Sequence, residues 1–446
     1  MADAHLEKNT TSLHEDLKSD NTHTVAEHGH AATDIYGNAL LTFDPKAEAR
    51  LRWKIDLYII PTVALLYLFC FIDRANIGNA RLAGLEKDLG LKGYDYNQVL
   101  SVFYISYIIF ESRWYRRSEL AFRLSLYIVM APLAGAFGGL LASAILTLDS
   151  FGSLHRWRMI FAIEGIVTCL LALISFFTLT DRPETARWLT QEEKDLAIAR
   201  VKSERVGQNE VLDKLDRKKT FRGIFNPVVL ATSVIFLLDN ITVQGLAFFA
   251  PTIVRTIYPK ATVVHQQLRT VPPYIVGAFF TVLFPFLSWR FDRRTIFMIA
   301  GAPLMMVGYI MFLASTESQV RYGATFIIAS GAFSFGALCN AQGSANVVTD
   351  TARASAIGTI VMFGNVGGLI STWSFLPFDG PNYRIGNGLN LATSSTILIL
   401  GIVLLLWMKR SNSKRAQVDV DAELAGKSAG EIEDLDWRHP SFRWRP

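Results

Sequence analysis

An acidic and a basic residue stand side by side near the end of the first long apolar stretch of this sequence. Asp73 and Arg74 follow Phe71 and Ile72, and Asn76 lies two residues further on. Charged side chains are costly to hold in a bilayer, so they are usually paired and functional. Here the carboxylate could bind and release a proton. The guanidinium could bind a substrate carboxylate, or pair with the aspartate when the site is empty. An ion pair that merely ends the helix at the membrane edge is the alternative.

A second acid, Glu164, lies in a later apolar stretch and is followed by Gly165. An acidic residue inside a span could take part in proton coupling. However, Arg156 and Arg158 precede it in the same stretch and could neutralise it in a structural ion pair. The sequence favours this structural role and leaves coupling open.

Polar side chains also interrupt the apolar stretch that begins near residue 226. They are Asp239, Asn240 and Gln244. Gln244 follows Asn240 by four residues, so the two side chains share one face of a helix. This spacing predicts a polar stripe that lines a cavity, with helix packing as the alternative.

Amides and tyrosines mark further stretches. Amides inside a membrane usually face protein or water, so they could contact a substrate or join helices. Tyrosine hydroxyls could bind a carboxylate, although tyrosines in spans more often serve packing. The amides are Asn340, Gln342, Asn346 and Asn365, and the tyrosines are Tyr104 and Tyr107.

The composition is that of a membrane protein. Of 446 residues, 51% are hydrophobic and 19% charged, and the mean hydropathy is +0.27. A soluble domain has about a quarter of its residues charged. The net charge of +5 comes from basic residues between apolar runs, which argues against a nucleic-acid surface. Motifs for ATP hydrolysis, serine or zinc hydrolysis and paired cysteines are absent, so we expect no enzyme, no metal and no cofactor.

Nine apolar runs are long enough to span a bilayer, and one run at 97–110 is shorter. Basic residues gather in alternate loops, at 50–54, 113–123, 290–294 and 409–415. Positive charge marks the cytoplasmic side, so both termini are expected there. The nine longer runs are 54–73, 123–148, 157–180, 226–250, 270–289, 295–314, 322–343, 354–375 and 390–408.

These runs predict an all-α membrane protein with about ten spans in two groups, four and six. We expect a disordered cytoplasmic tail at 1–50, an incomplete N-terminal bundle at 51–180, a cytoplasmic loop at 181–222, a six-helix C-terminal bundle at 223–409 and a cytoplasmic tail at 410–446.

The loop at 181–222 carries its own helix signal. Thr190 and Glu193 have the spacing of a capping box, in which each side chain satisfies a backbone N–H of the other residue. This predicts a charged surface helix over 191–204 that lies against the cytoplasmic face.

Several separated motifs resemble one family. They are FIDRANIGN at 71–79, LAGAFGGL at 133–140, RWRMIFAIEG at 156–165, DRPETARWL at 181–189, NVGGLI at 365–370 and PNY at 381–383. Together they resemble the anion:cation symporter branch of the major facilitator superfamily, and most closely the fungal allantoate and nicotinate permeases. The resemblance implies proton-coupled uptake of small organic anions by alternating access, with the positions of Asp73 and Arg74 in the central cavity.

The sequence departs from this family in its first half. The family has six spans in each half. Here FYISYIIFE at 103–111 looks like the middle of family helix 2, and SRWYRRSEL at 112–120 looks like the cytoplasmic end of helix 4. Roughly 60 residues, two spans and a loop, are therefore missing. A gating loop of the second half persists in degenerate form as Asp292, Arg293 and Arg294.

The predicted function is proton-coupled symport of a small organic anion, such as a vitamin carboxylate or a ureide. Its partners would be that anion, the proton and the lipid bilayer, and we expect a monomer in the plasma membrane. Two alternatives stay open. One is an exporter of an acidic metabolite, and the other is a truncated paralogue or mis-joined gene product that no longer transports.

Overall fold

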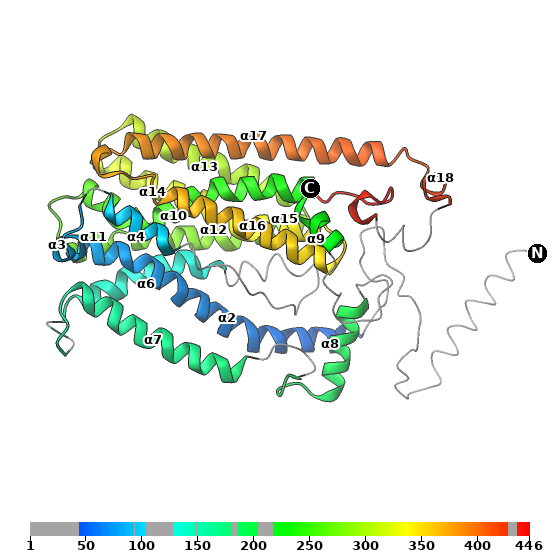
Figure 1. Cartoon of the computed structure of the whole chain (residues 1–446), viewed down its shortest axis with the longest axis horizontal. Helices are drawn as coiled ribbons and strands as arrows, with labels where there is room; N and C mark the ends of the chain where they lie inside the picture. The colour runs from blue at the N-terminus through cyan, green and yellow to red at the C-terminus, as the bar shows by residue number, and fades with distance from the viewer. Residues whose placement is uncertain are drawn as a thin grey trace, which may run out of the picture.

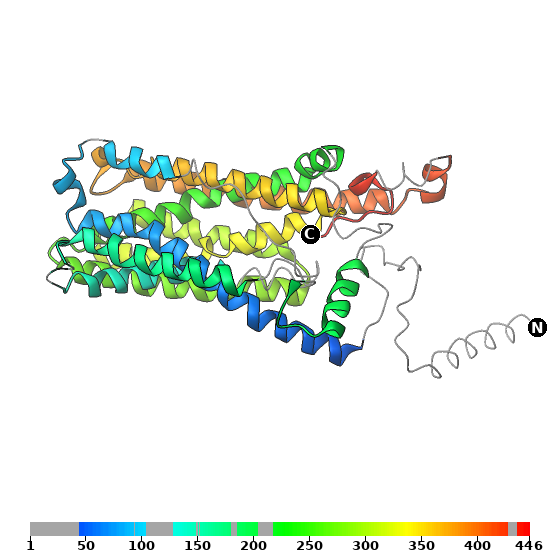
Figure 2. The same cartoon turned by 60° about the horizontal axis from the view of Figure 1, so that its bottom comes forward.

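The computed structural model shows an elongated bundle of helices that run roughly side by side (Figures 1 and 2). In the part of the chain that it describes, all regular secondary structure is helical. The described residues are 44–92, 94–103, 128–148, 150, 152–179, 185–203, 217–426 and 435–446.

The first span is much longer than the sequence predicted. Helix α2 runs from Pro45 to Leu82, 38 residues, whereas the apolar run covers only 54–73. At 1.5 Å per residue the helix is about 57 Å long, against a hydrocarbon core of about 30 Å. Its start is set by Asp44, whose carboxylate accepts hydrogen bonds from the N–H groups of Lys46 and Ala47. Flanking residues continue the helix beyond both ends of the apolar run.

Among the described residues, the rest of the first half contains one full-length candidate span and shorter helices. Helix α7 (Trp157–Thr178) is a candidate span, while α6 (Met130–Ile145) is apolar but shorter. Helix α3 (Leu85–Leu89) follows α2, and α4 (Asp95–Phe103) ends where the described residues end. The predicted runs at 123–148 and 97–110 thus correspond to α6 and α4.

The second half supplies six candidate spans, as the apolar runs predicted. The predicted run at 322–343 is built from α14 and α15, which together form one candidate span, Ser318–Ala345. Short helices α9 (Arg217–Ile224) and α11 (Val263–Leu268) flank α10. The spans are α10 (Pro227–Ile257), α12 (Val271–Phe291), α13 (Arg294–Ala314), α14 (Ser318–Ala332) with α15 (Phe335–Ala345), α16 (Asp350–Ser371) and α17 (Arg384–Arg415).

The predicted surface helix is confirmed as α8 (Gln191–Ser203). Both bonds of its capping box form, from Thr190 N–H to Glu193 Oε2 at 2.9 Å and from Glu193 N–H to Thr190 Oγ1 at 3.3 Å. Glu193 also pairs with Lys54 of α2 at 2.6 Å. Nearby, the rings of Trp188 and Tyr58 stack with centroids 4.7 Å apart. The loop therefore docks on the first turns of α2.

The last residues of the chain fold back onto the second half. Trp444 is 2% exposed and exchanges two 2.8 Å hydrogen bonds with the Asn412 side chain on α17. Its indole N–H donates to Ser411 at 3.0 Å. Figure 1 places the C-terminus beside α15 and α9. The sequence predicted only a cytoplasmic tail here, and the docking itself was missed.

Candidate functional site

Asp73 faces helix α7. The Thr168 hydroxyl of α7 donates to its carboxylate, at 3.2 Å from Oδ2 and 3.4 Å from Oδ1. The order of the residues in the chain allows Asp73 to pair with Arg74 when no substrate is bound, but these hydrogen bonds to Asp73 come from Thr168. The reason is helical geometry, since consecutive side chains on an α-helix point about 100° apart.

Arg74 lies on the face of α2 that meets the second half. It is 5% exposed, and its guanidinium carbon lies 4.5 Å from the centroid of the Phe71 ring. Gly78, one turn later on the same face, lies against α10, because a Cβ there would be only 2.7 Å from the carbonyl oxygen of Phe248. Arg74 therefore carries a buried positive charge toward the boundary between the halves.

Asn76 belongs to a third face of α2. It is fully buried, and its Oδ1 accepts no hydrogen bond within the described residues. Ile72 and Asn79, one turn before it and three residues after it, are the side chains nearest to Gly138 of α6. Asn76 thus lies toward α6, and the predicted site residues of α2 are spread over three faces of one helix.

Glu164 is buried on α7 without the partner that the sequence favoured. It is 1% exposed, and neither carboxylate oxygen accepts a hydrogen bond among the described residues. Arg158 instead donates to Asp88 at 3.0 Å, as does the indole of Trp157. These bonds, from Trp157 and then Arg158, hold the pKa of Asp88 below its usual value. The predicted ion pair of Glu164 with Arg156 or Arg158 is therefore wrong for this structure.

The polar residues of α10 do not form one stripe. Gln244 donates to the Asn240 side chain at 3.4 Å, so their predicted common face is confirmed. This face lies against α16, where a Cβ at Gly364 would be 3.1 Å from the Asn240 amide nitrogen. Asp239 is 1% exposed, accepts no hydrogen bond in the described part, and lies within electrostatic range of Tyr309 on α13. It belongs to the interior of the second half.

The amides of α15 serve two different purposes. Gln342 and Asn346 donate to the carbonyl of Arg445 at 2.8 and 3.1 Å, and the Arg445 N–H donates back to Asn346 Oδ1 at 2.8 Å. They hold the folded-back tail. Asn340 donates to the Gly336 carbonyl at 2.9 Å, which leaves its Oδ1 without a described donor. Asn365 of α16 is half-buried, with a similarly unsatisfied amide nitrogen.

The predicted gating loop joins α12 to α13 and contacts the tail. Asp292 adopts a left-handed backbone with φ of 49° and pairs with Arg294 at 3.1 Å. The Arg294 N–H donates to the carbonyl of Pro446 at 3.0 Å. Arg293 begins the extended turn into α13. Tyr104 and Tyr107 lie outside the described residues.

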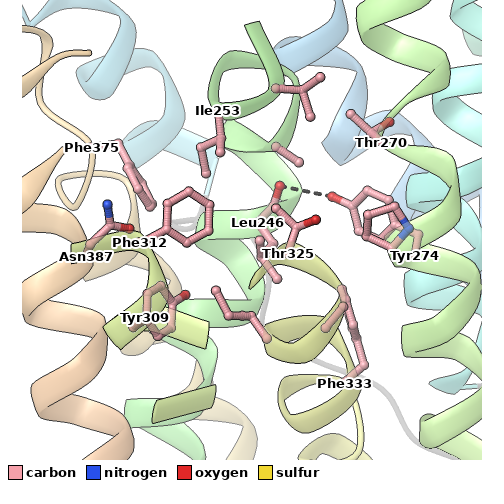
Figure 3. A pocket seen from close by; sticks show the side chains of 15 residues that line it. Leu246, Ile253, Thr270, Tyr274, Tyr309, Phe312, Thr325, Phe333, Phe375 and Asn387 are labelled. Carbon is pink, nitrogen blue, oxygen red and sulfur yellow. Dashed lines mark hydrogen bonds between the residues drawn. The ribbon is translucent and has the colours of Figure 1, made fainter. Parts of the chain in front are cut away.

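A pocket lies inside the second half, and none of the predicted site residues lines it (Figure 3). Its walls are mainly aromatic and aliphatic side chains of α10, α12, α13 and α14, such as Phe312 and Ile253. Polar groups on it are already engaged, as where the Tyr274 hydroxyl donates to the Leu246 carbonyl at 3.0 Å. A lining of this kind offers no counter-charge to an anion. The buried charges of α2 and α7 are therefore better candidates than this pocket.

The two halves meet at the end of the molecule that holds α3, α4 and α11 (Figure 1). Asn97 of α4 donates to the Thr372 carbonyl after α16, and Ser143 of α6 donates to Gln267 of α11 at 3.1 Å. At Gly135 of α6 a Cβ would be 2.6 Å from the ring of Tyr274 on α12. Gly135 and Gly139 of α6 thus allow a close approach to the opposite half.

Two helical groups that meet at one end are the arrangement of a two-bundle transporter. The Major Facilitator Superfamily model matches residues 101–372, more than half of the chain. The chain belongs to the Major Facilitator Superfamily. It is a multi-pass membrane transporter and not an enzyme, and the all-α fold predicted from the sequence is confirmed.

Curated relatives of the superfamily match almost end to end. The chain is 25% identical to the high-affinity nicotinic acid transporter of Saccharomyces cerevisiae, over 98% of this chain and 92% of that protein. It is 27% identical to the MFS-type transporter efuF of Hormonema carpetanum, over 96% and 99%. A crystal structure of a bacterial homologue of the human lysosomal transporter Spinster shares the fold, with a TM-score of 0.50 and 14% identity over 82% of this chain and 97% of that one.

These alignments are longer than the residues that this chain contributes to them. The match to the nicotinic acid transporter extends over 500 positions, and 98% of 446 residues is about 437, so about 63 positions hold no residue of this chain. For efuF, 497 positions and 96% of the chain leave about 69. This total is similar in size to two spans and a loop.

Proposed function

We propose that this transporter carries a small organic anion together with a proton, by alternating access. The observation that carries the proposal is Arg74, a buried guanidinium on the face of α2 that meets α10. A guanidinium there can bind a carboxylate between the halves through two parallel hydrogen bonds. One relative is a nicotinic acid transporter, and nicotinic acid is a carboxylic acid, which supports the same substrate class.

Asp73 provides the coupling in this proposal. Asp73 is the residue next to Arg74 in the chain. Opposite charges on neighbouring residues interact strongly where water is scarce. An ionised Asp73 weakens the attraction of Arg74 for a substrate anion, and a proton on Asp73 restores it. Proton and anion therefore bind together, and an acidic outside drives uptake. Asn76, Asp239, Gln244, Asn340 and Asn365 are proposed as further polar contacts along the pathway, with Tyr104 and Tyr107.

The test is uptake of radiolabelled nicotinate into cells that lack their own nicotinate transport. We expect Arg74→Ala to abolish uptake at normal surface expression. Arg81→Gln is the matched control: it removes an equal charge from the same helix, where Arg81 pairs with Glu86 at 2.8 Å, and it should retain most uptake. Uptake by Arg74→Ala equal to that of the unmodified protein would exclude the proposal.

Coupling has its own test in Asp73→Asn. This variant keeps the size of the side chain but loses the titrating group. We expect it to exchange labelled for unlabelled nicotinate across the membrane while losing the acceleration of uptake by external acid. Acid-driven accumulation equal to that of the unmodified protein would place coupling elsewhere.

The direction of transport and the setting are also proposals. We place the protein in the plasma membrane as a monomer with both termini in the cytoplasm, because basic residues mark those loops. The incomplete bundle at 51–180 and the six-helix bundle at 223–409 would be the two moving units. An exporter of an acidic metabolite would use the same residues, and accumulation in inverted vesicles distinguishes it from an importer.

The alignment gaps favour one alternative of another kind, a chain that no longer transports. About 63 missing positions are enough for two spans and a loop. Sequencing the mature messenger RNA decides its origin: a message that encodes the segment restores a complete first half. If the message lacks the segment, the uptake assay decides. No uptake at normal surface expression would then support a protein that no longer transports.

A further inference from the structure

We propose that Asp73 and Glu164 form a two-carboxylate site between α2 and α7 that holds one proton, with Thr168 as the residue that positions Asp73. The site itself stands on the geometry of these helices. Only its use in coupling rests on the proposed function.

The first observation is the inner stripe of α7. Ile160, Glu164 and Ser175 are buried along one side of this helix, and Thr168 is half-buried on the same side. The opposite side is open, with Leu173 59% and Phe176 80% exposed. An apolar helix that turns its one acid and a threonine inward is presenting them to its neighbour, which here is α2.

The second observation is that Glu164 lies among few other charges. Among the described residues, Asp73 carries the charge that acts on Glu164. Helix α6, which also packs on α7, contains no titratable side chain. The nearby cation Arg158 is already engaged by Asp88. Arg74 and the thiol of Cys70 are the other titratable groups close to Asp73 on α2.

The third observation is the hydrogen bond that fixes Asp73. Thr168 stands one turn after Glu164 on α7 and donates to both oxygens of Asp73, at 3.2 and 3.4 Å. A hydroxyl that donates to a carboxylate favours its ionised form. Glu164 has no such donor in the described part of the chain. The two acids therefore have unequal surroundings, although both lie on the sides of α2 and α7 that pack together.

Electrostatics then determines the occupancy of the pair. Two carboxylates between neighbouring spans, one buried and one half-buried, cannot both ionise without a large cost where water is scarce, so in this proposal they share a proton. In the arrangement seen, the proton belongs on Glu164 and the charge on Asp73. Transfer moves one proton from the Glu164 carboxyl to the Asp73 carboxylate, which leaves Glu164 ionised and Asp73 neutral. Atoms and charge balance without any other reactant.

In this arrangement the proton and the substrate bind on different sides of α2. The proton lies on the α7 side of α2, and Arg74 lies on the side that meets α10. Under the proposed function, movement of the proton from Glu164 to Asp73 would remove the negative charge next to Arg74 at the moment an anion binds. Glu164 thus acts as the proton store and Asp73 as the coupling residue.

The test is infrared spectroscopy of the purified full-length protein, without substrate, over a pH series. Protonated carboxyl groups give a C=O band that carboxylates lack. We expect Glu164→Gln to remove one such band at neutral pH. Asp239→Asn is the matched control, because Asp239 is equally buried but faces no other carboxylate in the described residues. Its band should be separate from that of Glu164.

Two further variants test the sharing itself. In Asp73→Asn the Glu164 band should disappear at a lower pH, because the opposing negative charge is gone, while the Asp239 band stays in place. In Thr168→Val the proton should move from Glu164 to Asp73, so the band of Glu164 should be replaced by a band of Asp73. Adding Asp73→Asn to this variant should remove the new band. Thr168→Ser keeps the hydroxyl and should show the original spectrum. A purely structural Thr168 would shift none of these bands.

The proposal is overturned if Glu164→Gln removes no band, or if the Glu164 band ignores Asp73→Asn. Folding is verified by size-exclusion chromatography, and Thr168→Ser supplies a mild variant if others unfold. Failure of the proposed transport function would give a different pattern. In that case uptake is absent for every variant, while the spectra still show the shared proton.

Discussion

The two halves of this transporter differ in how completely their helices cover one another. In the most apolar stretch of α2 and of α7, only 17% of the residues are buried. The corresponding share is 61% in α10 and 72% in α14 with α15. The second half has six candidate spans, whereas the described residues of the first contain two and the shorter α6. The described helices of the first half therefore cover one another less completely than those of the second half.

Glycines show the same difference at the level of single contacts. A Cβ at Gly367 of α16 would overlap the carbonyl oxygen of Leu237 and lie 2.9 Å from its carbonyl carbon. A Cβ at Gly165 of α7 would meet no atom of the described residues within 4 Å. Backbones in the second half therefore touch, and α7 keeps open space on that side.

The docked tail offers the largest test of this difference. Trp444 is almost fully buried among Trp407, Trp437 and Phe442, so Trp444→Ala removes the centre of an aromatic cluster. We expect a loss of about 3–5 kcal/mol in the free energy that holds the tail. A clear fall in Tm and rapid trypsin cleavage of the tail would show it. Arg438→Ala, at an exposed position in the same tail, should change little. Equal behaviour of the two variants would mean that the second half does not depend on its tail.

Gly367→Ala should have the next largest effect. The obstructing atoms belong to the backbone of α10, so they cannot rotate away, and α10 and α16 must separate. Overpacking of this kind costs about 1–3 kcal/mol. The measurement is the Tm of the purified protein in detergent. An unchanged Tm would show that the two helices are not in close contact.

Gly165→Ala is the counterpart in the first half. Open space accepts the methyl group, and alanine favours a helix over glycine by about 0.5–1 kcal/mol. We expect an unchanged or slightly higher Tm, with surface expression maintained. A fall similar to that of Gly367→Ala would show that α7 has a close neighbour on that side, which would reduce the contrast between the halves.

The contact between α8 and α2 should respond weakly to pH. Partial burial raises the pKa of Glu193, but the hydrogen bonds from Lys54 and Thr190 outweigh it, and the net pKa lies below the usual 4.5. Its stabilisation is therefore fully present above pH 4.5 and is lost as pH falls through the lowered pKa. Ion pairs this exposed contribute about 0.2–1 kcal/mol.

Glu193→Gln provides the measurement for that contact. Above pH 4.5 we expect faster hydrogen exchange in α8 for the variant than for the unmodified protein, and below the lowered pKa the two should converge. The backbone bond from Thr190 can form to glutamine as well, so it serves as an internal control for the cap. A difference between the proteins that persists in acid would assign the effect to something other than charge.

The sequence by itself determined what depends on local patterns. Apolar length gave the spans of the second half, the Thr190–Glu193 spacing gave α8, and the four-residue spacing placed Gln244 with Asn240. Only the tertiary structure decided which helix each buried polar group faces. In the structure Asp73 accepts a hydrogen bond from Thr168, and Arg158 binds Asp88 and not Glu164. Gln342 donates to the carbonyl of Arg445 in the tail. These pairings depend on how each helix is rotated about its axis, and that rotation is set by contacts between residues far apart in the chain.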